Sequence, residues 1–220
     1  MNINKYSTSD SYDYENGWYL TSDVKRIGKI LAHYELYKRI VDLPGDVLEL
    51  GVFKGTSLIR FASFRELLEN SNSRKIVGFD VWGKFPETNF EEDKDMRQNY
   101  IDITKDFLPL DDFKKSLDYK KLPNVELIQG DICNTVPSYV KNFPALKISL
   151  LHIDTDIYEP AKVALEYLWD KVVKGGVVIF DDYAVFPGET KAVDDFFRDK
   201  DVEIKKFSFS HNIPSYIIKK

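Results

Sequence analysis

The sequence lacks the features that cross-link a chain, export it or anchor it in a membrane. Cys133 is the only cysteine in 220 residues, which excludes an intramolecular disulfide and a zinc site built from several cysteines. The opening residues MNINKYSTSDSYDYENGWYL contain no apolar signal core, and no apolar run reaches membrane-spanning length. The net charge of −5 gives no general attraction to nucleic acid or anionic membranes. We therefore expect a cytoplasmic protein that binds neither of them.

Interdomain linkers are also lacking. No stretch rich in Pro, Gly or Ser divides the chain, so we expect a single domain over residues 1–220. Its N-terminal segment, about 1–44, is predicted to be helical. The polar stretch at about 83–122 predicts a lid-like insertion, with a solvated helical excursion as the alternative.

An amphipathic helix is expected within the N-terminal segment, where apolar residues recur at helical spacing. This pattern indicates a packing face rather than chemistry, and it leaves His33 without a role. The residues of the predicted packing face are Ile27, Ile30, Leu31 and Tyr34.

Short apolar runs rich in β-branched residues alternate with segments of helical spacing. The runs, which we interpret as buried strands, are 46–52, 75–81, 125–131, 148–154 and 177–182. The helical segments between them are 56–68, 158–173 and 189–199. Such alternation predicts an α/β fold, in which a mostly parallel sheet carries helices on both faces. Residues 203–220 add two further strands, joined by a turn at 210–214.

The first strand leads into a glycine-containing turn, ELGVFKGTSLIRF. Gly51 and Gly55 allow a tight turn there. Thr56 or Ser57 caps the following helix, whose free N–H groups attract an anion. Phe53 replaces the second glycine of the dinucleotide-binding pattern, so the motif is not that fingerprint. A plain tight turn is the alternative interpretation.

Two more acids at strand ends predict contacts to a nucleoside. Asp80 ends the second strand, at the distance from the glycine turn where an acid receives two ribose hydroxyls. Asp131 ends the third strand, where a carboxylate meets an adenine amino group beside the apolar wall of Ile132. Turn formation or helix capping is the alternative for each acid.

The order of these motifs resembles a known family. Gly45-Asp46 precedes VLELGVFKGTS, which is followed by VGFDVWGKFPE, QGD, LHIDTDIYE and GGVVIFDDY. The series is similar to the macrocin/mycinamicin O-methyltransferase family, a metal-dependent branch of the class I S-adenosylmethionine methyltransferases that acts on sugar hydroxyls. The resemblance covers about residues 25–200. It implies a Rossmann-like fold with a seven-stranded sheet whose last strand is antiparallel, and it implies S-adenosylmethionine and Mg²⁺ as cofactors.

The resemblance also implies roles for individual residues. Those expected to bind the cofactor are Glu49, Gly51, Gly55 and Ser57 at its methionine part, Asp80 at its ribose, and Asp131 with Ile132 at its adenine. Those that match the family's metal ligands are Asp154, Asp181 and Asp182. Three neighbouring carboxylates repel one another unless a divalent cation lies between them, and an all-oxygen set suits Mg²⁺. Separate aspartates that cap turns are the alternative.

The implied chemistry is methylation of a sugar hydroxyl that Mg²⁺ activates and aligns. Asp154 is the expected catalytic residue, as ligand and proton acceptor, with His152 as an alternative acceptor. Tyr158 and Phe85 are expected to contact the substrate. That substrate is a sugar on a glycosylated metabolite, a nucleotide sugar or a glycan. The sequence does not decide between them, or between a monomer and a homo-oligomer.

Two other functions stay open. A Mg²⁺-dependent methyltransferase of catechol-like phenols is one, but the related branch places a catalytic lysine three residues after Asp154, where this chain has Ile157. A nucleotide-binding scaffold that kept the fold and lost activity is the other. The acidic residues present in both metal motifs weigh against that scaffold.

Overall fold

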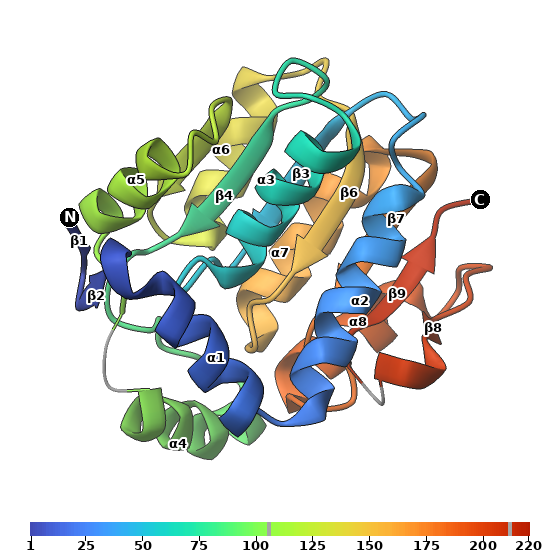
Figure 1. The fold of residues 1–220 in the computed structure, drawn as a ribbon. Coiled ribbons are helices and arrows are strands. Elements are labelled where there is room, and N and C mark those ends of the chain that lie inside the picture. The colour runs from blue at the N-terminus through green and yellow to red at the C-terminus, as the bar shows by residue number, and fades with distance from the viewer. Residues whose placement is uncertain (105–106, 211–212) are drawn as a thin grey trace.

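A seven-stranded sheet in the order β5-β4-β3-β6-β7-β9-β8 forms the centre of the computed structural model (Figure 1), which describes residues 1–104, 107–210 and 213–220. The strands are β3 (Asp46–Leu50), β4 (Ile76–Asp80), β5 (Val125–Gln129), β6 (Ile148–Ile153), β7 (Val172–Phe180), β8 (Lys205–Lys206) and β9 (Ser215–Ile218). The first five pair in parallel, whereas β9 runs antiparallel to β7 and β8. The predicted α/β fold is confirmed. The predicted turn at 210–214 includes residues 211–212, which lie outside the described residues.

The strand order reverses at β3. β4 and β5 lie on one side of this strand, and β6 and β7 lie on the other. Leu50 at the end of β3 is in register with Ile153 at the end of β6, so the two following loops start side by side. In parallel sheets, ligands bind at the carboxyl ends of the strands where the order reverses.

Six helices cover the two faces of the sheet (Figure 1). One layer contains α2 (Val24–Lys38), α3 (Thr56–Leu68) and α5 (Leu110–Tyr119), and the other contains α6 (Ile132–Asn142), α7 (Tyr158–Leu168) and α8 (Pro187–Phe197). Each layer packs an apolar core against the sheet, with Phe61 in one and Leu165 in the other fully buried. Each such side chain contributes about 1.5–3 kcal/mol through its burial.

Helix α7 ends earlier than the sequence pattern predicted. A short 3-10 turn, η3 (Trp169–Lys171), leads directly into β7. Val172 and Val173 therefore belong to a strand, although their apolar spacing continued the helical pattern. The pairing of Val172 with Ile148 of β6 explains this result, because tertiary pairing outweighs local propensity for β-branched residues.

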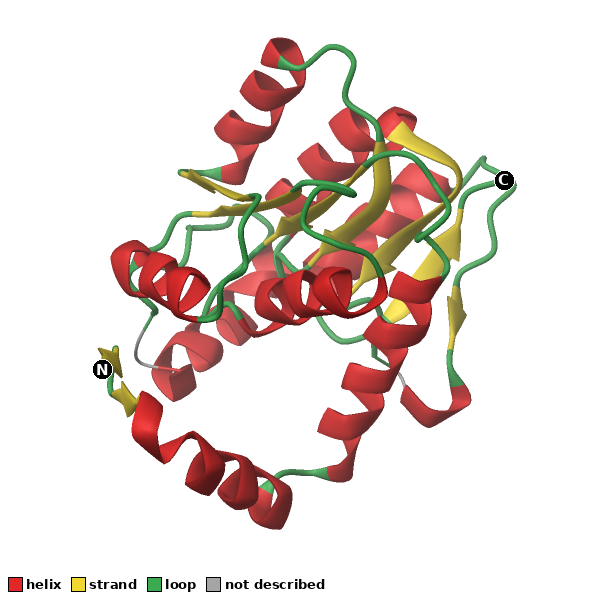
Figure 2. Cartoon of the chain, turned by 45° about the horizontal axis from the view of Figure 1, so that its top comes forward, coloured by secondary structure: helices red, strands yellow, loops and turns green. Residues whose placement is uncertain are grey.

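The N-terminal segment contains a small hairpin and two helices. The elements before α2 are β1 (Asn2–Ile3), β2 (Tyr6–Ser7), η1 (Thr8–Asp10) and α1 (Ser11–Thr21). Figure 2 shows α1 standing away from the sheet, and none of its residues is buried. Among the described residues, no helix combines the length and the apolar character that a membrane crossing requires.

Helix α2 packs through only part of the predicted face, where Ile30 and Tyr34 are partly buried against the core. Ile27 and Leu31 are exposed, whereas Gly28 and Ala32 are buried. Small residues explain this choice, because a Cβ at Gly28 would lie 2.4 Å from the backbone oxygen of Phe209 in η4 (Ser208–Ser210). Helix α2 therefore turns toward the rest of the protein the side whose small residues allow close backbone approach.

The predicted lid-like insertion at 83–122 includes a helix that packs in the core. α5 is the crossover helix between β4 and β5, and its Phe113 and Leu117 are buried in the core. The remainder contains η2 (Glu91–Asp93) and α4 (Lys94–Thr104). Residues 105–106 lie outside the described residues.

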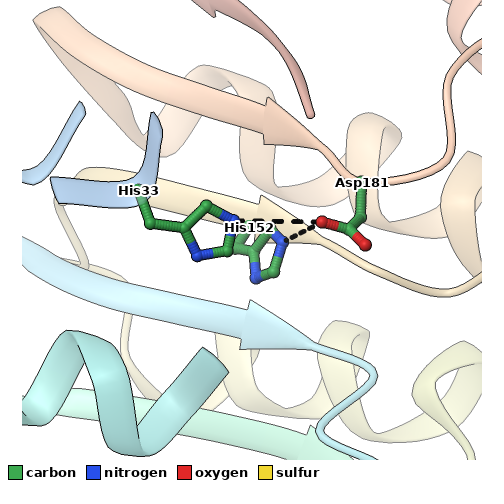
Figure 3. A group of neighbouring side chains, drawn as sticks. All are labelled: His33, His152 and Asp181. Atoms are coloured by element: carbon green, nitrogen blue, oxygen red, sulfur yellow. Dashed lines mark hydrogen bonds and ion pairs between the residues drawn. The ribbon is translucent and has the colours of Figure 1, made fainter. Parts of the chain in front are cut away.

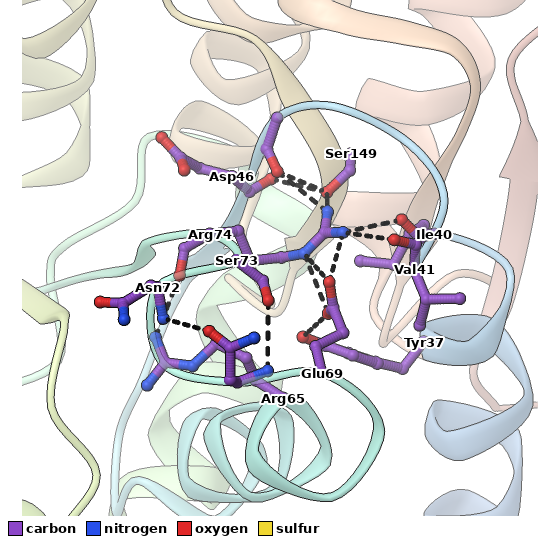
Figure 4. Close-up of polar contacts among 12 residues, drawn as sticks. Tyr37, Ile40, Val41, Asp46, Arg65, Glu69, Asn72, Ser73, Arg74 and Ser149 are labelled. Atoms are coloured by element: carbon purple, nitrogen blue, oxygen red, sulfur yellow. Dashed lines mark hydrogen bonds and ion pairs between the residues drawn. The ribbon is translucent and has the colours of Figure 1, made fainter.

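Arg74 organises the amino-terminal edge of the sheet (Figure 4). Its guanidinium donates to Ser149 Oγ at 2.6 Å and to the backbone oxygens of Gly45 and Ile40 at 3.0 and 2.9 Å. It also forms an ion pair with Glu69 at 2.7 Å. This buried network joins α2, α3 and the starts of β3 and β6, and its role is structural.

Candidate active site

A cavity of about 680 Å³ opens at the carboxyl ends of the central strands. Gly51, Asp80 and Asp154, which end or follow β3, β4 and β6, line it together with Asp182 after β7. Residues of α2, α3, the 83–104 segment and the starts of α6 and α7 also contribute to the lining. The cavity therefore lies where the strand order reverses, and its size suits a small-molecule ligand.

Gly51 permits the closest approach between two strand ends. Its φ is +87°, and a Cβ there would lie 1.7 Å from the backbone oxygen of Asp154. The Gly51 N–H donates to Phe79 O, and the Asp154 N–H donates to Leu50 O, both at 2.9 Å. These bonds fix the two loops, so this part of the cavity is lined by backbone.

Asp80 lines the cavity and also holds part of the backbone that forms its wall. Its Oδ2 accepts hydrogen bonds from the backbone N–H groups of Val52 and Phe53, both at 2.8 Å. Its Oδ1 accepts one from the N–H of Trp82 at 2.6 Å. The carboxylate thus holds the turn after β3, while its predicted contact with ribose stays a prediction.

The other predicted cofactor residues separate into two groups. Ser57, Asp131 and Ile132 line the cavity, and Asp131 also caps α6 by accepting a hydrogen bond from the Cys133 N–H at 2.8 Å. Glu49 and Gly55 do not belong to the described lining.

Glu49 and Gly55 have structural surroundings instead. Glu49 is fully buried and accepts a hydrogen bond from Ser57 Oγ at 2.5 Å. A Cβ at Gly55 would lie 2.1 Å from the ring of Phe113. Gly55 is therefore required for the packing of α5 against α3, and Glu49 supports the cavity from behind.

Three carboxyl groups meet inside the cavity. Oxygens of Asp154, Asp156 and Asp182 lie within 4.8 Å of one another. Burial raises the pKa of each carboxyl most strongly, and repulsion from neighbouring aspartates raises it further. Proton uptake or a divalent cation would relieve that repulsion, and the all-oxygen donor set fits Mg²⁺.

Asp156 was missed by the sequence analysis, and Asp181 differs from its predicted surroundings. Asp181 forms an ion pair with Lys29 of α2, and its Oδ1 lies 3.3 Å from His152 Nε2 (Figure 3). Burial alone would raise the pKa of Asp181, but Lys29 and His152 hold it well below its ordinary value. In this geometry, Asp156 replaces Asp181 in the closest group of carboxyls. The spacing of Asp154 and Asp156 by two residues was the available signal.

Two buried histidines adjoin Asp181 (Figure 3). Arg60 Nη1 lies 3.0 Å from His33 Nδ1, and since a guanidinium only donates, the His33 proton must lie on Nε2. That nitrogen faces Asp181 Oδ1 at 3.9 Å. Burial, followed by the charge of His152, holds the pKa of His33 well below its ordinary value. His33 therefore adjoins the site as a neutral side chain, a placement that the helical pattern did not indicate.

His152 is the charged member of the pair. Burial lowers its pKa, but Asp181 and Glu49 outweigh burial and raise it to about 10. Its Nδ1 lies 3.8 Å from Glu49 Oε2. Nε2 faces Asp181 Oδ1 at 3.3 Å, whereas Nδ1 has no hydrogen-bond partner among the described residues. A protonated imidazole has no lone pair for another proton. This charge state weighs against His152 as the alternative proton acceptor, and the choice between His152 and Asp154 stays a prediction.

Aromatic side chains line the cavity that contains the acidic group. Phe85 and Tyr100 of the 83–104 segment line the cavity with their ring centroids 5.8 Å apart. Phe53 and Phe186 lie 5.7 and 6.4 Å from Tyr100 and also line the cavity. Burial, followed by the charge of Asp156, raises the pKa of Tyr100, so its phenol stays protonated.

Tyr158, predicted to contact the substrate, lies outside the described lining. Its ring stacks on Phe90 at a centroid distance of 5.3 Å, and its N–H donates to Asp93 Oδ2 at 2.9 Å. Tyr158 thus joins the start of α7 to the segment that precedes α4.

Two curated relatives are each 27% identical to the chain. One, from Streptomyces olivaceus, is the 8-demethyl-8-(2,3-dimethoxy-alpha-L-rhamnosyl)-tetracenomycin-C 4'-O-methyltransferase, which aligns over 148 residues, 65% of this chain and 54% of that protein. The other, from Streptomyces niveus, is the demethyldecarbamoylnovobiocin O-methyltransferase, which aligns over 162 residues, 70% of this chain and 59% of that protein. The chain therefore spans somewhat more than half the length of these relatives.

Solved structures share the fold more completely. CalS11, a calicheamicin methyltransferase, superposes with a TM-score of 0.73 and 25% identity over 98% of this chain and 88% of that chain. The O-methyltransferase NovP superposes with a TM-score of 0.75 and 21% identity over 88% of this chain and 80% of that chain. These neighbours confirm the predicted class I methyltransferase fold.

A family profile matches the part of the chain that contains the motifs from which the resemblance was noted. Residues 26–208 match the profile of the family described as Macrocin-O-methyltransferase (TylF). The match includes the glycine turn, Asp80, Asp131 and both acidic motifs. The resemblance noted from the sequence is confirmed, and the chain belongs to the macrocin-O-methyltransferase (TylF) family.

Proposed function

We propose that the protein is an S-adenosylmethionine-dependent and Mg²⁺-dependent O-methyltransferase whose acceptor is the hydroxyl of a sugar on a small molecule. The observation that carries this proposal is the meeting of Asp154, Asp156 and Asp182 in the same cavity as the glycine turn and Asp80. Family membership supports methyl transfer to oxygen. Relatives whose names contain a rhamnosyl group or TDP-rhamnose support a sugar as the acceptor.

The cofactor would lie along the cavity. It supplies a sulfonium methyl group that is already activated for transfer. Asp131 and Ile132 would contact the adenine, and Asp80 would accept hydrogen bonds from the ribose hydroxyls. The backbone at Gly51 and the side chain of Ser57 would hold the methionine part, which brings the methyl group toward Asp154.

The acidic group would bind the metal and the acceptor. Asp154 and Asp182 would hold Mg²⁺, with Asp156 as a neighbouring carboxyl and Asp181, kept ionised by Lys29, as the other candidate ligand. Mg²⁺ bound there lowers the pKa of a hydroxyl that it contacts and orients a vicinal diol. Asp154 would accept the hydroxyl proton as the new carbon–oxygen bond forms.

The aromatic side chains of the cavity would shield this reaction. Phe85 and Tyr100 line the same cavity as the acidic group and would exclude water when the acceptor is bound. Exclusion of water strengthens every electrostatic contact in the site. The lid role of residues 83–104 is thus part of the proposal.

Two alternative functions can be distinguished from the proposed one. For a catechol-like phenol, the missing lysine is the main objection, since Ile157 is buried and apolar. For a scaffold without activity, the objection is the cost of keeping three neighbouring carboxyls in a cavity with no cation to bind.

Methyl transfer to a panel of acceptors would test the proposal. TDP-rhamnose, an aryl rhamnoside and catechol are incubated with labelled S-adenosylmethionine and Mg²⁺. We expect transfer to a sugar, loss of transfer with chelator or in Asp182→Asn, and normal transfer in Asp170→Asn, which changes an exposed aspartate. Calorimetry should show that all variants bind S-adenosylhomocysteine.

Each of the other possible results of this experiment would contradict one part of the proposed function. Transfer to catechol alone would favour the phenol alternative. Cofactor binding without transfer to any acceptor would favour the scaffold. Full transfer in excess chelator, with metal content confirmed as negligible, would exclude the role of Mg²⁺.

A further inference from the structure

Glu189 is a buried acid that adjoins the cavity without lining it. It belongs to the first turn of α8, its side chain is fully buried, and it is outside the described lining. Gly188 before it allows this position, because a Cβ there would lie 2.5 Å from the backbone nitrogen of Tyr158 at the start of α7. Burial of a carboxyl group is costly unless hydrogen bonds compensate for it. The hydrogen bonds of Glu189 therefore indicate its role.

Those hydrogen bonds reach the two loops that carry the acidic group, 154–157 after β6 and 181–186 after β7. Glu189 Oε1 accepts a hydrogen bond from the N–H of Asp182 at 2.9 Å. Its Oε2 accepts one from the N–H of Thr155 at 3.3 Å, and its own N–H donates to Asp156 O at 3.2 Å. Each oxygen of the carboxyl group therefore holds the backbone of a different loop.

The sheet does not join these two loops beyond the ends of its strands. The last bond between β6 and β7 runs from the Asp181 N–H to Ile153 O at 2.9 Å. Beyond it, within the described parts of the chain, no backbone hydrogen bond runs directly between 154–157 and 182–186. Glu189 therefore supplies the hydrogen-bonded link between the two backbones.

We propose that Glu189 is a positioning residue for the metal, which sets the separation of Asp154 and Asp182 through the backbones of their loops. This inference rests on the proposed function, because it assumes that these carboxylates hold Mg²⁺. Mg²⁺ requires oxygen ligands at about 2.0–2.1 Å in nearly octahedral geometry, so its affinity depends closely on that separation. Replacing a residue that orients metal ligands typically lowers metal affinity by about 10- to 100-fold.

Binding of Mn²⁺ tests this role without a methyl acceptor. Mn²⁺ prefers the same oxygen ligands as Mg²⁺, and electron paramagnetic resonance measures how much of it stays free. The variants are Glu189→Gln, which keeps one acceptor oxygen of the two, and Glu189→Met, which keeps none. Glu166→Gln is the matched control, because Glu166 is exposed on α7. Asp182→Asn identifies the ion that binds to the acidic group, since it changes a ligand.

We expect Mn²⁺ to bind about 10- to 100-fold more weakly to Glu189→Gln than to the wild type, and more weakly still to Glu189→Met. Glu166→Gln should keep the wild-type affinity for Mn²⁺. Calorimetry should show the same affinity for S-adenosylhomocysteine in all these proteins, because Glu189 is outside the cavity lining. A loss confined to the metal would distinguish positioning from general support of the fold.

Unchanged Mn²⁺ affinity in Glu189→Gln would overturn the inference. Equal losses of Mn²⁺ and S-adenosylhomocysteine binding, or loss of the folded state by circular dichroism, would overturn it as well, since Glu189 would then support the whole protein. Failure of the wild type to bind Mn²⁺ would overturn the metal dependence in the proposed function and this inference with it. Metal binding without methyl transfer to any acceptor would overturn the proposed function alone and leave the role of Glu189 intact.

Discussion

Replacing Gly51 by alanine tests whether the contact between the ends of β3 and β6 builds the active site. The added Cβ would lie 1.7 Å from the backbone oxygen of Asp154 and 2.7 Å from its carbonyl carbon. Ordinary contact begins at 3.4 Å, so the two loops would have to separate by about 1.7 Å. No side chain can move aside to relieve this clash, because both opposing atoms belong to the backbone.

The magnitude follows from two costs. A left-handed backbone costs about 1–2 kcal/mol for a residue with a side chain, and overpacking costs about 1–3 kcal/mol. We therefore expect Gly51→Ala to lower the free energy of unfolding by about 2–5 kcal/mol. Displacement of Asp154 by more than 1 Å should also lower kcat by about 100-fold or more in the protein that remains folded.

Urea denaturation and initial rates would measure the two effects. Gly17→Ala is the matched control, because no atom lies within 4 Å of its added Cβ and Gly17 is within helix α1. That substitution should leave kcat unchanged and stabilise the helix by up to about 1 kcal/mol. If Gly51→Ala kept the stability and the kcat of the wild type, the reasoning would be refuted. The ends of β3 and β6 could then separate without any cost in free energy.

Three further predictions address other parts of the molecule. Arg74→Met should lower the free energy of unfolding in urea by about 3–5 kcal/mol, because it leaves the Glu69 carboxylate buried without its partner; a change below 1 kcal/mol would contradict this. Asp80→Ala should weaken S-adenosylhomocysteine by about 10- to 100-fold in calorimetry, and equal affinity would remove Asp80 from the cofactor site. Lys29→Met should destabilise the protein, and Asp181→Asn should recover part of the loss in a double-mutant cycle, since the two side chains form an ion pair. Additive effects would show that the pair is not coupled.

The fold and the position of the site were predictable from local patterns. The runs that became β3, β4, β5 and β6 are apolar and end near acids, and a parallel sheet brings such ends to one edge. Gly51 and Asp80 were identified for this reason. The order of the motifs then added the family, which no single run could indicate.

The electrostatic partners within the site were not predictable in the same way. Lys29 and Asp181 are 152 positions apart, and nothing local to either indicates the other. Lys29 and His33 are four residues apart on α2, which was a signal for a shared helix face, but exposed residues of the same helix had the stronger apolar pattern. Which face of a helix packs depends on its neighbours, here the close approach of η4 at Gly28.

The strand order also restricts how the sheet can assemble during synthesis. β8 pairs only with β9 among the described strands, and β9 lies between β8 and β7 although it follows both in the chain. The five parallel strands can therefore pair while the chain is still growing, but β8 must wait for β9. Until then, the edge of β7 presents unpaired backbone groups, which makes it the expected place for aggregation or chaperone binding on the ribosome.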